Sequence, residues 1–255
     1  MHLIGPILNQ MSGVAKPQRK FMSILLTALT YLPGRANFRN LDRYTSLNEK
    51  TFSRWFRRSF DFVTFNLLSL KDLPNSGEWV AAIDASFSPK SGRTSYGLDW
   101  FWNGSQGQAE RGYAKTKFIN GKEHGKTYTA LLFCTDIDCT ALDILRYYKA
   151  RFQIEFVFRD AKQYTGLCDC QATSEAKLNF HFNASLAALN LLRLEDRQQA
   201  VEGAGRNVIS IASWKTRKFN AHLLERFSCH LGVDFTAIKS SLGFAALCNY
   251  GAIAA

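Results

Sequence analysis

The sequence predicts an α/β protein that begins with a small all-α segment. Residues 20–73 have the spacing of amphipathic and buried helices, whereas residues 78–135 contain three short runs that are typical of strands. Two further helical patterns follow, over residues 138–164 and 174–197. Strands combined with long helices in this way indicate a sheet that is covered by helices.

Composition and charge limit the class of protein. The 255 residues are 46% hydrophobic, which excludes general disorder and allows one or two domains with a hydrophobic core. Lys and Arg number 32 against 21 Asp and Glu, and the net charge of +11 indicates a polyanionic partner. Residues 16–60 hold ten Lys or Arg and two acidic residues, which gives this segment alone a charge of +8.

The basic segment contains a predicted pair of helices. FMSILLTALTYL forms a first helix that Pro33 and Gly34 end, and a short helix over 41–44 follows it. After a turn, Asn48 is a suitable N-cap for a helix over 49–60. That helix carries the four cations that we expect to contact DNA: Lys50, Arg54, Arg57 and Arg58. The arrangement fits a helix-turn-helix, and the alternative is a helical hairpin with a solvated basic face.

Three strands are predicted next. EWVAAIDASF, residues 78–87, is a short apolar run that carries the acid Asp84. In the second run, residues 95–103, large side chains at 96, 98, 100 and 102 alternate with Gly97, Asp99 and Phe101. Residues 127–135 form the third run. Residues 104–126 are polar, hold five glycines and have little periodicity, so we expect a loop there.

The helix predicted over 138–164 carries an unusual stripe of side chains. At about 100° per residue, four positions share one narrow face, with Arg159 beside them. The four residues are Tyr148, Arg151, Glu155 and Lys162. Apolar residues flank the stripe on both sides, which favours a polar cleft. The alternative is an ordinary surface helix on which Arg151 and Glu155 form an i,i+4 ion pair.

These residues suit phosphoryl-transfer chemistry. A carboxylate in an apolar strand, such as Asp84, is costly unless it is paired or binds a metal. Together with Glu155 it would supply part of a two-metal site for Mg²⁺ or Mn²⁺, the ions that clamp the attacking and leaving oxygens of a phosphodiester. Arg151 and Lys162 would hold flanking phosphates, and Tyr148 would stack on or hydrogen-bond to a DNA end.

The spacing Y-x2-R-x3-E-x6-K, from Tyr148 to Lys162, resembles the Y-R-E-K signature of insertion-sequence transposases of the DDE superfamily. RFQIEFVFRDAKQYTGL resembles the segment of that family that carries its glutamate, and AAIDASF resembles its first-aspartate strand. The resemblance covers roughly residues 78–195. It implies a ribonuclease-H-like mixed sheet with flanking helices over 74–200, after a DNA-binding segment at 1–73 and before a helical tail at 201–255.

The resemblance also implies an activity and its partners. The activity is DNA transposition, in which strands at the element ends are cut and then joined to target DNA. Asp84 and Glu155 would be the first and third catalytic acids, with Mg²⁺ or Mn²⁺ as cofactor. The partners would be double-stranded DNA, namely the terminal inverted repeats and the target, and a second copy of the chain in a homodimer.

The second catalytic acid of the family has no clear counterpart here. Glu155 follows Asp84 by only 71 positions, which leaves no room for a further strand ending in Asp. Asp136, at the end of a predicted strand, is the remaining candidate for a metal ligand. We expect a segment to have been lost between Gly112 and Lys126, leaving a transposase by descent that is inactive alone. The alternatives are an active transposase, a DNA-binding derivative that competes with an intact relative, and an accidental match.

Other site classes and locations are disfavoured. The six cysteines contain no CxxC pair and the five histidines are scattered, so neither a zinc site nor a disulfide framework is expected. The apolar stretches are too short to span a membrane, and a signal-peptide cleavage pattern is lacking. We therefore expect a cytoplasmic bacterial protein that makes no membrane contact and is nucleoid-associated when it binds DNA.

Overall fold

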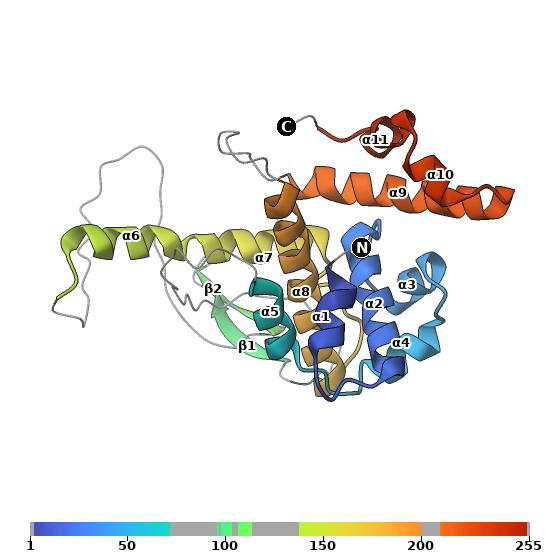
Figure 1. Cartoon of the computed structure of the whole chain (residues 1–255). Coiled ribbons are helices and arrows are strands. Elements are labelled where there is room, and N and C mark those ends of the chain that lie inside the picture. Colours follow the sequence, from blue (N-terminus) through green and yellow to red (C-terminus); the bar gives the residue numbers. More distant parts are fainter. Residues whose placement is uncertain are drawn as a thin grey trace. The chain divides into compact units, whose positions relative to one another are not determined.

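The computed structural model of the chain describes residues 3–71, 96, 98–103, 107–113, 138–199 and 210–253. The chain forms two compact units (Figure 1). We call residues 1–73 together with 160–255 the helical unit, and residues 74–159 the hairpin unit. The boundary at 159/160 falls inside a helix, α7 (Gln153–Tyr164), so this helix belongs to both units.

The helical unit is built on two long helices, α2 (Lys16–Tyr31) and α8 (Glu175–Gln199), which contact each other (Figure 1). The other helices are α1 (Ile4–Gln10), α3 (Phe38–Tyr44), α4 (Glu49–Trp55), α5 (Phe62–Leu70), α9 (Ile211–Leu231), α10 (Phe235–Lys239) and α11 (Leu242–Cys248). The helices α1 and α9 contact α2, and α5 contacts α8. The basic N-terminal helices thus share a core with α8, in contrast to the three consecutive domains that we expect from the sequence.

Aromatic side chains form the centre of this core. Phe52 and Phe56 of the α4 region are 0% and 1% exposed. The ring of Phe56 lies 4.6 Å from that of Phe180 on α8, and the ring of Phe21 on α2 lies 5.7 Å from that of Phe52. Each buried Phe side chain contributes on the order of 2–3 kcal/mol through the apolar area that it removes from water. These rings therefore fix the buried face of α4.

The ends of α4 follow local signals. The predicted N-cap is confirmed, since Asn48 Oδ1 accepts the backbone N–H of Thr51 at 2.9 Å. The sequence predicts that this helix extends to residue 60, but in the structure it ends at Trp55. The reason is that Arg57 and Arg58 donate their N–H groups to the carbonyls three residues earlier, which tightens the last turn while Phe56 enters the core.

In its described residues, the hairpin unit contains strands β1 and β2, helix α6 and the first part of α7. Strands β1 (Leu98–Asn103) and β2 (Gln108–Tyr113) pair antiparallel, with Leu98 opposite Tyr113. Helix α6 (Ala141–Arg151) and the first part of α7 follow. The prediction of a loop over 104–126 is wrong at β2. The sequence of this strand, QAERGY, is mostly polar, but pairing with β1 satisfies its backbone hydrogen bonds.

The predicted ribonuclease-H-like mixed sheet is wrong. Across the described residues the chain is mostly helical, and the two strands there form a single antiparallel pair. The apolar faces of α2, α5 and α8 are buried against other helices, so in this part of the chain the core is made by helix packing and not by a sheet. The predicted strands at 78–87 and 127–135 lie outside the described residues.

The predicted helix over 138–164 is divided into α6 and α7 at Phe152. There the N–H of Phe152 donates to Lys149 O and the N–H of Glu155 to Phe152 O, both three residues back, so the turn is tighter than in an α-helix.

Within the described segments, the structure has no helix with the length and apolarity needed to cross a membrane.

Candidate nucleic-acid interface

The face of α4 that points away from the core is polar and basic. Lys50, Ser53, Arg54 and Arg57 are spaced i, i+3, i+4 and i+7, which places them on one side of a helical segment. Lys50, Arg54 and Arg57 are exposed. Because the aromatic core holds the opposite side, packing determines that this side of the segment is exposed.

A cleft lies along this face. Its volume is about 890 Å³, and it separates α3 and α4 from the start of α8 and the residues that precede α8. We call it the basic cleft. The residues that line it are Ala36, Asn37, Phe38, Asn48, Glu49, Lys50, Ser53, Arg54, Arg57, Cys170, Gln171, Ala172, Lys177 and His181. Three of the four cations predicted to contact DNA therefore face one space.

The fourth predicted cation, Arg58, lies elsewhere. Its guanidinium is 4.4 Å from the centre of the Trp55 ring, and Trp55 in turn stacks on Phe21 at 5.1 Å. A smaller hollow of about 290 Å³ is lined by Pro17, Arg54, Trp55 and Arg58. Arg58 is thus an exposed cation on the neighbouring side of the helix, and Arg54 lies between the two hollows.

Lys177 of α8 also lines the basic cleft, which no pattern in the sequence indicates. Its Nζ donates a hydrogen bond to Ser53 Oγ at 2.7 Å, across 124 positions of sequence. Desolvation, and next the charge of Arg57, lower the pKa of Lys177 below its ordinary value. No local pattern could reveal this residue, because its neighbours are set by the packing of α8 against the N-terminal helices.

The Y-R-E-K stripe begins on α6. The guanidinium of Arg151 lies 5.4 Å from the Tyr148 ring and 5.0 Å from the Phe152 ring, and these two rings meet edge to face at 5.7 Å. Tyr148 and Arg151 are therefore brought together. Glu155 is exposed, and within the described part of the chain it forms no ion pair with Arg151. The i,i+4 ion pair of the alternative interpretation is therefore not formed between these two residues, which lie on either side of the tight turn at Phe152.

The other stripe residues lie further along α7. The Arg159 guanidinium is 4.8 Å from the Phe156 ring, and Arg159 is exposed. Lys162 is exposed as well and belongs to the helical unit. One residue after Arg159, Asp160 is only 6% exposed and accepts a hydrogen bond from Arg193 of α8 at 3.0 Å. The sequence analysis missed this acid, which anchors the second half of α7 in the helical unit.

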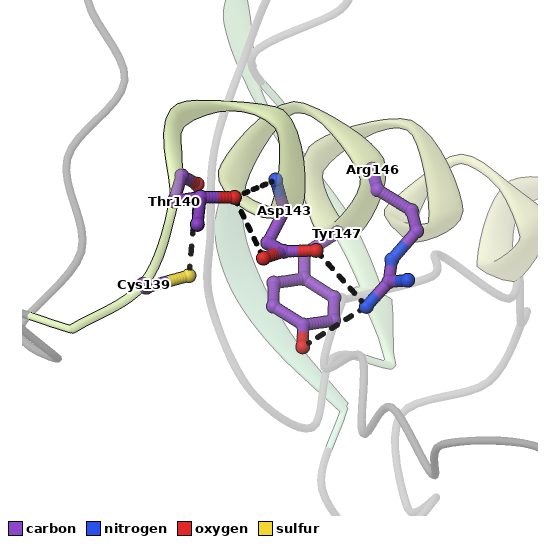
Figure 2. A network of polar contacts seen from close by, with 5 residues as sticks. All are labelled: Cys139, Thr140, Asp143, Arg146 and Tyr147. Carbon is purple, nitrogen blue, oxygen red and sulfur yellow. Dashed lines mark hydrogen bonds and ion pairs between the residues drawn. The ribbon is translucent and has the colours of Figure 1, made fainter.

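A network of polar contacts holds the start of α6 (Figure 2). Thr140 caps the helix, since its Oγ1 accepts the backbone N–H of Asp143 at 3.2 Å and donates to Asp143 Oδ2 at 2.7 Å. Arg146 then bridges Asp143 and the hydroxyl of Tyr147. In α6, whose residues are all described, no side chain is buried. Its order therefore depends on local contacts more than on burial.

The predicted metal site stays a prediction. Of its three carboxylates, the structure describes Glu155, while Asp84 and Asp136 lie outside the described residues. Among the described residues, no group of three His, Cys, Asp or Glu side chains is placed to hold a metal ion. Glu155 by itself offers too few oxygen ligands for Mg²⁺.

Comparison of the chain with protein-family models, with curated proteins and with solved structures finds no match.

Proposed function

We propose that this chain binds double-stranded DNA through α4, as a derivative of an insertion-sequence transposase that does not cut DNA by itself. One observation carries the proposal. Lys50 and Arg54 on the exposed face of the capped helix α4 line one cleft together with Arg57 just beyond the helix end, and the aromatic core holds the opposite face of α4. Because packing holds the backbone of this helix in place, binding a polyanion there needs no rearrangement of the helix, only ordering of the side chains.

The charges on this face are available to a partner. Within the described residues, none of these three cations forms an ion pair with a carboxylate. Arginine binds phosphate oxygens through two parallel N–H groups, and neutralised phosphates release counterions from DNA. The +8 charge of residues 16–60 extends this basic character beyond α4. These features support a phosphate-contacting surface.

The Y-R-E-K resemblance supports the choice of partner and place. On that basis we propose the terminal inverted repeats and target DNA of an insertion sequence as ligands, and a second copy of the chain in a homodimer. The protein would then act at the nucleoid in the bacterial cytoplasm. A derivative that binds element ends without cutting them would compete with an intact transposase.

Duplex binding at several salt concentrations tests the proposal. The double variant Arg54→Ala, Arg57→Ala should bind a duplex more weakly and reduce the slope of log K against log salt by about 2, since it removes two phosphate contacts. The matched control Arg226→Ala, Lys239→Ala removes two exposed cations from α9 and α10 and should leave the slope unchanged. Equal slopes for the α4 variant and the unaltered chain would exclude α4 as the DNA contact.

A second candidate function is metal-dependent strand cleavage and strand transfer. The spacing of Tyr148, Arg151, Glu155 and Lys162 favours it, with Asp84 and Glu155 as proposed ligands of Mg²⁺ or Mn²⁺. The assay is cleavage of an element-end duplex in Mg²⁺ or Mn²⁺, with the chain compared to Glu155→Gln. We expect no cleavage by either protein. Cleavage that disappears in Glu155→Gln would establish the active transposase instead.

A further inference from the structure

The basic cleft gathers positive charge from two distant parts of the chain. Lys50, Arg54 and Arg57 line it from the α4 side, and Lys177 lines it from α8. Glu49 is the one acidic residue among the lining side chains. Four cations against one anion in a single hollow leave an excess of positive charge, which folding must hold together against mutual repulsion.

Lys177 is held in a defined position. Its Nζ lies 2.7 Å from Ser53 Oγ and 5.8 Å from the centre of the Phe38 ring. The side chain is half-buried, and the lowered pKa of Lys177 arises first from desolvation and then from the charge of Arg57. Both causes disfavour the ammonium form, and the charge of an anion in the cleft would favour it.

The donors converge on the same space. Ser53 accepts the bond from Lys177 with an oxygen lone pair, so its own O–H can donate to a ligand. The ammonium group keeps two further N–H bonds, and the guanidinium of Arg57 offers a planar fork that matches two oxygens. Within the described residues, neither Lys177 nor Arg57 forms an ion pair with a carboxylate.

We propose that the basic cleft binds a phosphate group between Lys177 and Arg57, with the hydroxyl of Ser53 as a further donor. A volume of about 890 Å³ accommodates a phosphate with its attached sugar and base. The phosphate comes from the DNA backbone beside α4 or from a free phosphate or nucleotide. The choice of DNA as the source of the phosphate rests on the proposed function. The binding of a phosphate group in the cleft rests only on the residues that line it.

The test uses the full chain with Lys177→Met, and with Lys239→Met as the matched control on α10. In the duplex arm, Lys177→Met should weaken binding severalfold at every sequence and reduce the salt slope by about 1. In the phosphate arm, inorganic phosphate should raise the thermal unfolding midpoint of the unaltered chain and not that of Lys177→Met. Lys177→Arg keeps the charge and should restore most of both effects, and Ser53→Ala should weaken both partly.

The outcomes separate the cleft from the proposed function. A response to Lys177→Met in the phosphate arm alone supports the cleft with a free phosphate as its ligand. If Lys177→Met and Ser53→Ala match the unaltered chain in both arms, the cleft proposal is overturned, even where the Arg54 and Arg57 double variant loses DNA binding. Circular dichroism of each variant establishes that it is folded, and the conservative Ser53→Ala keeps the test valid if Lys177→Met fails to fold.

Discussion

Two basic helical regions of this chain differ in what holds them. The cations of α4 stand on a helix whose other face carries Phe52 and Phe56, both almost completely buried. The cations of the stripe, Arg151 and Arg159, lie instead against rings of their own helices, and no side chain of α6 is buried. Packing between distant elements determines which face of α4 is exposed, whereas α6 has no buried side chain.

The difference shows what a helical wheel can establish. Spacing places residues on one face, but a binding site also needs a second element that faces them. For α4 that element is α8, which supplies Lys177. For the stripe, the helix is interrupted at Phe152, so the spacing of one ideal helix does not describe the positions on both sides of that residue.

The largest expected effect concerns a pair of phenylalanines. Phe56→Ala removes a ring that is 1% exposed and lies 4.6 Å from Phe180, so we expect a loss of about 3–5 kcal/mol in the free energy of unfolding. Phe156→Ala changes a ring on α7 that is 42% exposed and should cost less than about 1 kcal/mol. Chemical denaturation measures both, and similar losses would show that α7 is packed as firmly as α4.

The end of α7 provides the next test, because its second half is anchored. Gly166 has φ +75°, its carbonyl accepts a hydrogen bond from His181 at 2.7 Å, and a Cβ there would collide with Ala36. Gly166→Ala should therefore destabilise the helical unit by about 2–4 kcal/mol. Gly232→Ala is the control, since Gly232 has φ +67° and open space around a Cβ, and it should cost only about 1 kcal/mol. Equal costs would mean that Ala36 moves aside.

The predictable parts of the fold are those with local causes. Asn48 as a cap, the break at Pro33 and the helical periodicity of α2 and α8 depend on neighbours in sequence, and the structure confirms them. The helical core, strand β2 and the partnership of Lys177 with Ser53 depend on distant contacts. A mostly polar segment such as QAERGY has no hydrophobic pattern that predicts a strand. It forms one here because β1 supplies the partners for its backbone hydrogen bonds.

A buried lysine makes the anchoring of α7 measurable by pH. Lys215 Nζ donates to the carbonyl of Tyr164 at the end of α7, and burial lowers the pKa of Lys215 from 10.5 to about 8. The unfolded chain therefore holds this proton more tightly, and stability should increase as pH rises from about 8 toward 10.5. Over the whole range the gain in the free energy of unfolding is on the order of 3 kcal/mol.

Thermal unfolding between pH 7 and 9.5 measures this contribution, with Lys215→Met as the comparison. Lys215→Met should reduce the increase of the unfolding midpoint with pH. It also removes the hydrogen bond to Tyr164, so its midpoint at pH 7 can differ from that of the unaltered chain without affecting the test. Tyr31, whose pKa burial raises from 10.0 to about 12, lowers stability only above pH 10 and does not affect this window. A rise of the same steepness in Lys215→Met would assign the pH dependence to another group.

The smallest effect compares two helix caps, one in each unit. Asn48→Ala removes the acceptor for the N–H of Thr51 in α4 and should cost about 1 kcal/mol in the helical unit, with weaker duplex binding. Thr140→Ala removes the corresponding acceptor at α6, which no buried side chain supports, so amide hydrogen exchange in α6 should accelerate. Exchange in α4 and duplex binding should stay as they were. Faster exchange in α4 after Thr140→Ala would mean that the two units unfold together, and local order in α6 would then contribute to the stability of the face that we propose to bind DNA.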